Sequence, residues 1–223
     1  MTLQLEGRRA RRRKGRATGR KTGFTLQGLK TLESDFLRHR KWHDLCLLSL
    51  GVDSMYRAED LLALRVWDLL YADGSVRSHL LPRQQKTDEP VYPYLTPETR
   101  RYAMEWIAFS GKAPADFLFT GERKGADALP ITRGWYSTKI KGWAKHLDLP
   151  PEDYATHSIR RTKPILLFWE AEKRGPWDAA QALTIISTLL GHSDIATTLR
   201  YIGVNQHRAD QLLEPFRLFQ GHR

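Results

Sequence analysis

The chain has 223 residues, of which 41% are hydrophobic, enough to bury one sizeable core in a single domain with appendages. The N-terminus is polar and then basic, and no apolar run approaches the roughly 18 residues of a membrane span. We therefore expect a cytoplasmic protein without a signal peptide or membrane anchor. The single cysteine, Cys46, excludes an intramolecular disulfide, and the histidines lack zinc-ligand spacing, so no metal site is predicted.

The charge distribution indicates a polyanionic partner. The formal net charge is +11, and residues 1–21 carry +8 of it, with nine basic residues against one acidic residue. A run of this composition is predicted to be disordered alone and to lie along a phosphate backbone when bound, although a solvated tail without a role would look the same. We expect residues 1–24 to form a basic arm whose predicted DNA contacts are Arg8, Arg9, Arg11, Arg12, Arg13 and Lys14.

Helical spacing of apolar residues begins directly after this arm. It predicts one core helix over residues 26–37 and a second from residue 42 to about Gly51. A turn over 52–57 then leads into a strongly helical run over 58–64. Arg57 falls at the start of that helix, where a positive charge opposes the helix dipole. A functional reason for Arg57 is therefore plausible, although a surface or ion-paired arginine is the commoner case.

Between residues 66 and 95 the apolar period shortens toward that of strands. Val76 to Leu81 and Val91 to Leu95 are predicted to pair as a small antiparallel sheet. Lys86 lies in the loop between them. From the local sequence alone, this residue is a solubilising loop lysine or a cation held close to a site.

Helix returns after this predicted sheet. Pro97, preceded by a threonine cap, predicts a helix that ends at Gly111. A later amphipathic helix over 133–147 presents Lys139 and Lys141 on a basic face. That face could contact phosphates or could simply be solvated.

His157 and Arg160 stand three residues apart at the start of another predicted helix. They fall on one helical face and can present an imidazole and a guanidinium to the same anion. The planar guanidinium binds two phosphate oxygens at once and keeps its charge at any relevant pH. The alternative is a capped helix start with exposed charges. Pro164 is expected near the first turn, where a missing N–H is tolerated.

The segment 189–202 brings a histidine and a tyrosine toward what could be one phosphate. Gly191 is a predicted helix stop, His192 lies in the turn that it opens, and Ser193 is the predicted N-cap of a short helix. Tyr201 lies at the far end of this helix. Because a phenol has a pKa of about 10, a nucleophilic tyrosine needs a cationic pocket or a nearby base. The upstream arginines and lysine are the candidates for that pocket.

Together these segments resemble the catalytic domain of the tyrosine recombinases, the phage integrase family, over roughly residues 25–215. The resemblance rests on joint order and spacing rather than on any one residue. It implies a mainly α-helical fold with a small antiparallel β-sheet, followed by a C-terminal tail helix within a catalytic domain over 25–223. The matching positions are Arg57 with Asp60 three residues on, Lys86 in Gln85-Lys86-Thr87, His157 and Arg160 in the box 157–162, and His192 with Tyr201 nine residues later.

The resemblance implies a DNA strand transferase that works through a 3′-phosphotyrosyl intermediate and needs no metal or nucleotide cofactor. Tyr201 would be the nucleophile. Arg57 and Arg160 would bind the non-bridging phosphate oxygens, and His192 would be a further hydrogen-bond donor. Reversal by the 5′-hydroxyl of a different strand would complete recombination.

The remaining roles follow from the same resemblance. His157 would assist proton transfer at the nucleophile, Lys86 would be the general acid, and Asp60 would orient its neighbours. The implied partner is double-stranded DNA, with which the protein would associate in the nucleoid. Exchange between two duplexes needs four active sites, so we expect a tetramer on DNA. The apolar C-terminal run over 209–219 would dock on a neighbouring protomer or pack on its own domain.

The sequence also departs from the family pattern. The family usually carries a separate helical core-binding domain that helps to clamp DNA, and too few residues precede Arg57 to build it. The stretch between Arg160 and Gly191 is longer than usual, with residues 173–176 as the expected inserted loop.

Three other functions remain open at this point. A type IB topoisomerase would share the chemistry and rejoin the same strand. A catalytically silent DNA-binding regulator would keep the fold, although an intact Tyr201 and both arginines argue against it. A basic RNA- or ribosome-associated protein would account for the arm but for none of the later motifs.

Overall fold

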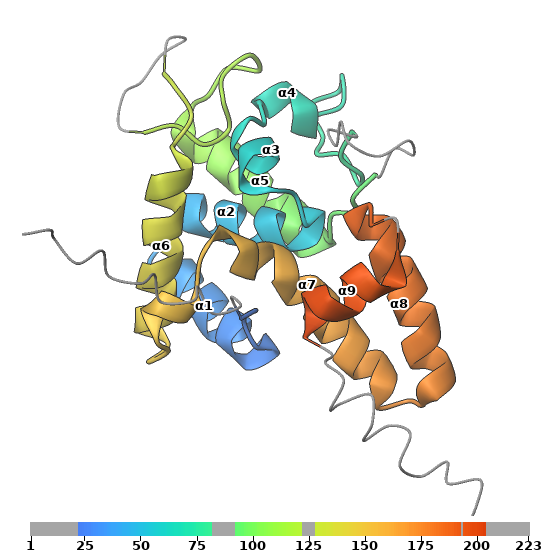
Figure 1. The fold of residues 1–223 in the computed structure, drawn as a ribbon. Coiled ribbons are helices and arrows are strands. Elements are labelled where there is room, and N and C mark those ends of the chain that lie inside the picture. The colour runs from blue at the N-terminus through green and yellow to red at the C-terminus, as the bar shows by residue number, and fades with distance from the viewer. Residues whose placement is uncertain (1–21, 82–91, 122–127, 193, 204–223) are drawn as a thin grey trace, which may run out of the picture.

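The computed structural model describes residues 22–81, 92–121, 128–192 and 194–203. Over these residues the fold is helical, and the helices form two adjoining groups that meet at α7 (Figure 1). The elements are α1 (Leu26–Arg38), α2 (Trp42–Ser54), α3 (Ala58–Leu62), α4 (Val66–Leu69), α5 (Pro97–Ser110), α6 (Arg133–His146), the 3-10 helix η1 (Pro151–Asp153), α7 (Thr156–Glu172), α8 (Pro176–Leu190) and α9 (Ile195–Ile202).

The larger group packs around α2, which lies in the middle of the domain in Figure 1. Leu45, Cys46 and Leu47 are consecutive in this helix and are each 1% exposed or less. Successive residues of a helix point in different directions, so α2 is covered on all sides, as expected for a helix that is apolar all round. It packs against α1, α5 and α7. The predicted end at Gly51 falls short, since α2 continues to Ser54.

The smaller group consists of α7, α8 and α9. Its buried cluster combines Met55 from the end of α2 with Phe168, Ile186, Leu190 and Ile202 from the three helices. Residues 173–175, within the predicted inserted loop, form the short turn between α7 and α8. The two groups are joined along α7, because its first half contributes to the larger core and its second half to this cluster.

Helix α7 corrects one sequence prediction. Pro164 does not lie near the first turn, because α7 begins at Thr156 and the proline is in the helix interior. Proline has no N–H, so the backbone carbonyl of Arg160, four residues earlier, has no helical donor. The helix is instead supported from its side, where Thr162 accepts a hydrogen bond from the backbone N–H of Phe24 at 3.0 Å. Phe24 is 1% exposed, so the chain already belongs to the packed core there.

The small antiparallel sheet is not confirmed. No β-strand occurs among the residues that the structure describes, which contain only isolated antiparallel bridges. One of these joins His79 to Tyr94, with backbone hydrogen bonds from Leu80 to Pro93 (3.0 Å) and from Leu95 to Ser78 (2.8 Å). The two predicted strands therefore touch at one point.

Several predictions fall outside the described residues. These are the predicted basic arm up to residue 21, Lys86 with the other residues of 82–91, and the apolar C-terminal run over 209–219. Within the described ranges, no helix has both the length and the apolar character needed to cross a membrane.

Candidate active site

Arg160 is a buried arginine on α7, only 4% exposed. Its guanidinium donates to the backbone carbonyls of Met55, which follows α2, and of Leu190, the last residue of α8, the latter at 3.0 Å. Carbonyls at helix ends have no helical donor, so two helix ends supply the acceptors. Burial lowers the pKa of Arg160 below its usual value, but a guanidinium stays charged at any pH relevant here.

Arg57 lies beside Arg160 at the junction of α2 and α3. It is the N-cap residue of α3, in extended backbone, and its side chain does not cap the helix. Its positive charge lowers the pKa of both Arg160 and His192, whereas the nearby Asp60 carboxylate raises the pKa of Arg160. The two guanidinium charges repel each other, and an anion bound by both would offset that repulsion.

Tyr201 projects from the last turn of α9 with a buried hydroxyl. Burial raises the pKa of this phenol to about 12, while the charges of Arg160 and Arg161 act in the opposite sense. The hydroxyl lies near the Arg160 guanidinium but makes no hydrogen bond of good geometry within the described part of the chain. The tyrosine is therefore protonated at neutral pH and is surrounded by positive charge.

His192 contacts the ring of Tyr201 edge-on, with ring centroids 5.4 Å apart and planes at 76°. Gly191 makes this possible because it ends α8 in the left-handed conformation (φ 65°), which turns the chain toward α9. The imidazole Nδ1 forms a 2.9 Å hydrogen bond with the Thr198 hydroxyl. Burial and the charges of Arg160 and Arg57 lower the pKa of His192, so its imidazole is neutral at pH 7.

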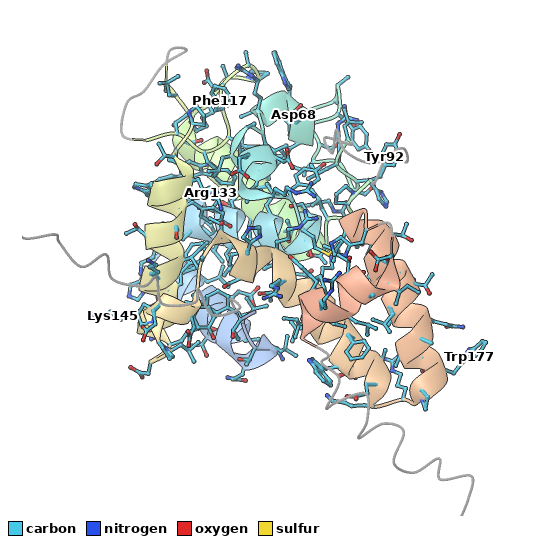
Figure 2. All side chains as sticks on the ribbon, viewed as in Figure 1. Asp68, Tyr92, Phe117, Arg133, Lys145 and Trp177 are labelled. Carbon is cyan, nitrogen blue, oxygen red and sulfur yellow. The ribbon has the colours of Figure 1, made fainter. Side chains whose placement is uncertain are left out.

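His157 occupies the first turn of α7 and is exposed. Partial burial of its ring lowers its pKa, and the charges of Arg133, Arg160 and Arg161 lower it further. Arg133 belongs to the N-terminal turn of α6, next to α3, where it pairs with Glu59 at 3.2 Å (Figure 2). A second neutral imidazole therefore lies at the edge of the arginine cluster.

The structure thus brings together five of the six predicted site residues. They come from the α3 start, from α7, and from the segment joining α8 to α9, so no single element forms the site. Two fixed cations, two neutral imidazoles and a buried phenol can bind one phosphate and bring a nucleophile to it. The five residues are Arg57, His157, Arg160, His192 and Tyr201.

Comparisons with known proteins identify the family and the fold. The model of the phage integrase family matches residues 28–208. This chain belongs to the phage integrase family. A search of curated proteins found no match to it.

Solved structures share the fold of this integrase-family chain. The XerA recombinase is 15% identical with a TM-score of 0.61, covering 90% of this chain and 67% of its own. The XerH site-specific recombinase, in a pre-cleavage complex with its difH substrate, is 15% identical with a TM-score of 0.61, covering 88% and 55%. The Tn1549 transposon integrase with circular intermediate DNA is 17% identical with a TM-score of 0.55, covering 86% and 64%. This chain therefore spans about half to two thirds of these structures.

Other predicted residues lie away from the cluster or outside the described ranges. Lys139 pairs with Asp44 of α2 at 3.0 Å and lies over the Trp135 ring, so its charge is already engaged within the domain. Lys141 is exposed on α6. The predicted N-cap Ser193 is wrong, because the Asp194 carboxylate accepts the Thr197 N–H at 2.7 Å and caps α9. A carboxylate is the stronger acceptor at the positive end of a helix.

Three residues of the site were not predicted from the sequence. Arg161 places its guanidinium over the Tyr201 ring, Met55 supplies a carbonyl to Arg160, and Thr198 holds the His192 ring. The adjacent arginines at 160 and 161 are visible in the sequence, but their burial, which is rare for arginine unless it is paired, is not. The other two contacts carry no local signal because they depend on packing between elements.

Proposed function

We propose that this chain is a site-specific DNA recombinase of the integrase type, which cleaves and rejoins DNA strands through a 3′-phosphotyrosyl intermediate. The observation that carries the proposal is the position of Tyr201, buried among Arg57, Arg160 and Arg161 and in ring contact with His192. A phenol is a poor nucleophile unless cations and a base act on it together. Family membership and the DNA complexes of the XerH and Tn1549 proteins support double-stranded DNA as the substrate.

In the proposed reaction the Tyr201 oxygen attacks phosphorus and the bond from phosphorus to the 5′-oxygen breaks. Arg57 and Arg160 bind the non-bridging oxygens, where negative charge grows in the transition state, and His192 donates a further hydrogen bond. The phenol proton passes to the His157 imidazole, whose lowered pKa leaves it neutral and able to accept. Attack by a 5′-hydroxyl then reverses these steps and releases the tyrosine.

The departing 5′-oxygen needs a proton, and we assign this role to Lys86. The support is positional, because the segments on either side of residues 82–91 are bridged at His79 and Tyr94. We propose that these segments form the two-stranded hairpin predicted from the sequence, with Lys86 close to its tip. Asp60 orients the arginines, consistent with its effect on the Arg160 pKa.

The same proposal covers the rest of the chain. Residues 1–21 of the predicted arm would track the phosphate backbone, since Phe24 already belongs to the core. Lys141 and Lys139 would be further contacts from α6, although the Asp44 pair would have to open for Lys139 to take part. Residues 25–223 would form the catalytic domain. Exchange between two duplexes would use four copies, linked through the C-terminal run over 209–219.

The test is covalent trapping. Duplex DNA nicked beside the scissile phosphate loses the short 5′-hydroxyl strand after cleavage, so rejoining is blocked and the protein stays attached. We expect wild-type protein to form an adduct that survives denaturing electrophoresis. Tyr201→Phe removes one oxygen and little volume, and should bind the DNA yet form no adduct.

A matched control is Tyr71→Phe, which makes the same change at an exposed tyrosine 45% accessible to solvent. This variant should form adduct at the wild-type rate. Because the target site is unknown, the substrate is first obtained by mapping DNA attached to the protein in cells. An adduct that persists in Tyr201→Phe would refute the assignment of the nucleophile.

A further inference from the structure

Arg161 is a buried arginine to which the proposed reaction assigns no step. It follows Arg160 on α7 and is 7% exposed. Its guanidinium carbon lies 4.8 Å from the centroid of the Tyr201 ring. Consecutive helical residues point about 100° apart, so the two arginines face different groups. Arg160 is directed to the Met55 and Leu190 carbonyls, whereas Arg161 covers the tyrosine.

We propose that Arg161 is a positioning residue for Tyr201, whose guanidinium holds the aromatic ring in the plane from which its oxygen can reach the phosphate. The inference rests on the proposed function, since it concerns the same nucleophile. A guanidinium over a ring face is attracted by the ring electrons, and this attraction strengthens when both groups are buried. His192 contacts the same ring edge-on, so the ring has neighbours in two directions.

The Tyr201 side chain packs against the apolar cluster of the smaller group, but its own helix supports it weakly. Helix α9 has only eight residues, too few for a stable isolated helix, and Tyr201 is next to its last residue. The hydroxyl lies near the Arg160 guanidinium but makes no hydrogen bond of good geometry within the described ranges, so the oxygen end is weakly held. Contacts of the ring itself therefore do most to set its orientation.

The charge of Arg161 has a second effect on the same residue. Burial raises the pKa of Tyr201 to about 12, and Arg160 and Arg161 both lower it. Loss of the Arg161 charge should therefore make the phenol harder to ionise. This effect separates a role at the nucleophile from a purely structural role, which would slow cleavage equally at every pH.

The experiment measures single-turnover adduct formation on the nicked duplex at saturating DNA, from about pH 6 to 10 around the range in which phenol and imidazole titrate. Arg161→Met keeps an unbranched apolar stem and removes the guanidinium and its charge. We expect its rate to fall about 3- to 30-fold, the range of a partly buried cation–π contact, with unchanged DNA affinity. Its pH–rate profile should shift to higher pH.

Two further variants make the result specific. Arg161→Lys keeps the charge but lacks the planar group. Its pH–rate profile should therefore stay at the wild-type pH, while its rate falls. This variant also provides the test if Arg161→Met does not fold. Arg200→Met is the matched control. Arg200 is exposed on α9, the helix that carries Tyr201, and its guanidinium donates to the Thr197 hydroxyl and the Ala196 carbonyl. This control should react at the wild-type rate and pH.

The inference is overturned if Arg161→Met matches wild type in rate and pH profile. It is also overturned if that variant only weakens DNA affinity and reacts normally at saturation, which would make Arg161 a DNA contact. A wild-type protein that forms no adduct would instead refute the proposed function.

Discussion

At the scale of single residues, Met55 links the two halves of the site. Its backbone is left-handed (φ 52°, ψ 23°), a conformation that costs a residue with a side chain about 1 kcal/mol or more. Its carbonyl accepts a hydrogen bond from Arg160, and its buried side chain packs in the cluster beneath α8 and α9. The strained backbone is thus held by contacts on both sides, and it lies two residues before Arg57.

This strain predicts that glycine is more stable than alanine at position 55, the reverse of their order inside a helix. Met55→Ala loses the buried side chain and keeps the strain, whereas Met55→Gly loses the same side chain but relieves the strain. We expect the free energy of unfolding of both variants to be lower than that of wild type by about 2 to 5 kcal/mol. The glycine variant should be more stable than the alanine variant by about 0.5 to 1 kcal/mol. Urea unfolding measures the difference.

The control is Ala108→Gly at an exposed position inside α5, which should show the ordinary order with alanine more stable by about 1 kcal/mol. If glycine is the less stable residue at position 55 as well, the left-handed backbone there carries no strain.

At the scale of elements, the crossing of α2 and α7 determines where the site residues lie. Gly51 is buried in α2, and a Cβ there would come within 2.8 Å of the Ile159 Cγ2 and 2.9 Å of the Tyr136 hydroxyl. Ile159 lies on α7 between His157 and Arg160. The missing side chain at position 51 therefore allows α7 to approach α2 closely enough for Arg160 to reach the Met55 carbonyl.

We predict that Gly51→Ala displaces α7 and affects the reaction more than stability. Overpacking should cost about 1 to 3 kcal/mol, partly offset by up to about 1 kcal/mol from better helix propensity. Adduct formation should fall by roughly tenfold or more, because small misplacements of catalytic groups are costly. Unfolding and trapping assays on one preparation would give both values.

Gly142→Ala is the matched control, because Gly142 lies inside α6 and a Cβ there would meet no atom within 4 Å. This variant should gain up to about 1 kcal/mol in stability and react normally. Equal activity of Gly51→Ala and Gly142→Ala would show that the close approach of α2 and α7 is not needed for the site.

At the scale of the whole molecule, the site lies where the two helical groups meet. Arg57 comes from the larger group, His192 and Tyr201 from the smaller one, and Arg160 from the helix that joins them. A small rotation between the groups would separate nucleophile from cations. The chain enters the larger core by Phe24, and the basic residues of the predicted arm all precede it.

We predict that removal of residues 1–21 weakens non-specific DNA binding and flattens its salt dependence. The segment holds +8 of the net charge of +11. The slope of log K against log salt is negative, and removing the arm should reduce its magnitude by about 0.9 for each phosphate that the arm neutralises. The truncation must stop at Lys21, because the backbone N–H of Thr22 donates to the backbone carbonyl of Asp153 at 3.2 Å. Binding titrations at several salt concentrations measure the slope.

A full-length variant provides the control for chain length, with glutamine replacing Arg8, Arg9, Arg11, Arg12, Arg13 and Lys14. Its slope should fall toward that of the truncated protein. Slopes equal to wild type in both proteins would mean that the arm does not contact DNA.

The sequence by itself determined the helical character, the family and the residues to examine. Apolar residues at helical spacing predicted α1, α2, α5 and α6, because an amphipathic helix must show that period wherever it packs. The order from Arg57 to Tyr201 was also visible, since side-chain chemistry and spacing are properties of the chain alone. Strand pairing was harder, and the predicted sheet is reduced to one bridge between His79 and Tyr94 among the described residues.

Only the tertiary structure decided how those residues meet. Arg160 is held by carbonyls 105 and 30 residues away, and Arg161 covers the ring of Tyr201, 40 residues further along the chain. The burial that raises the Tyr201 pKa likewise comes from packing between helices. Local spacing reports which way a side chain leaves its own helix, but not which neighbour it meets, because that depends on close approaches such as the one at Gly51.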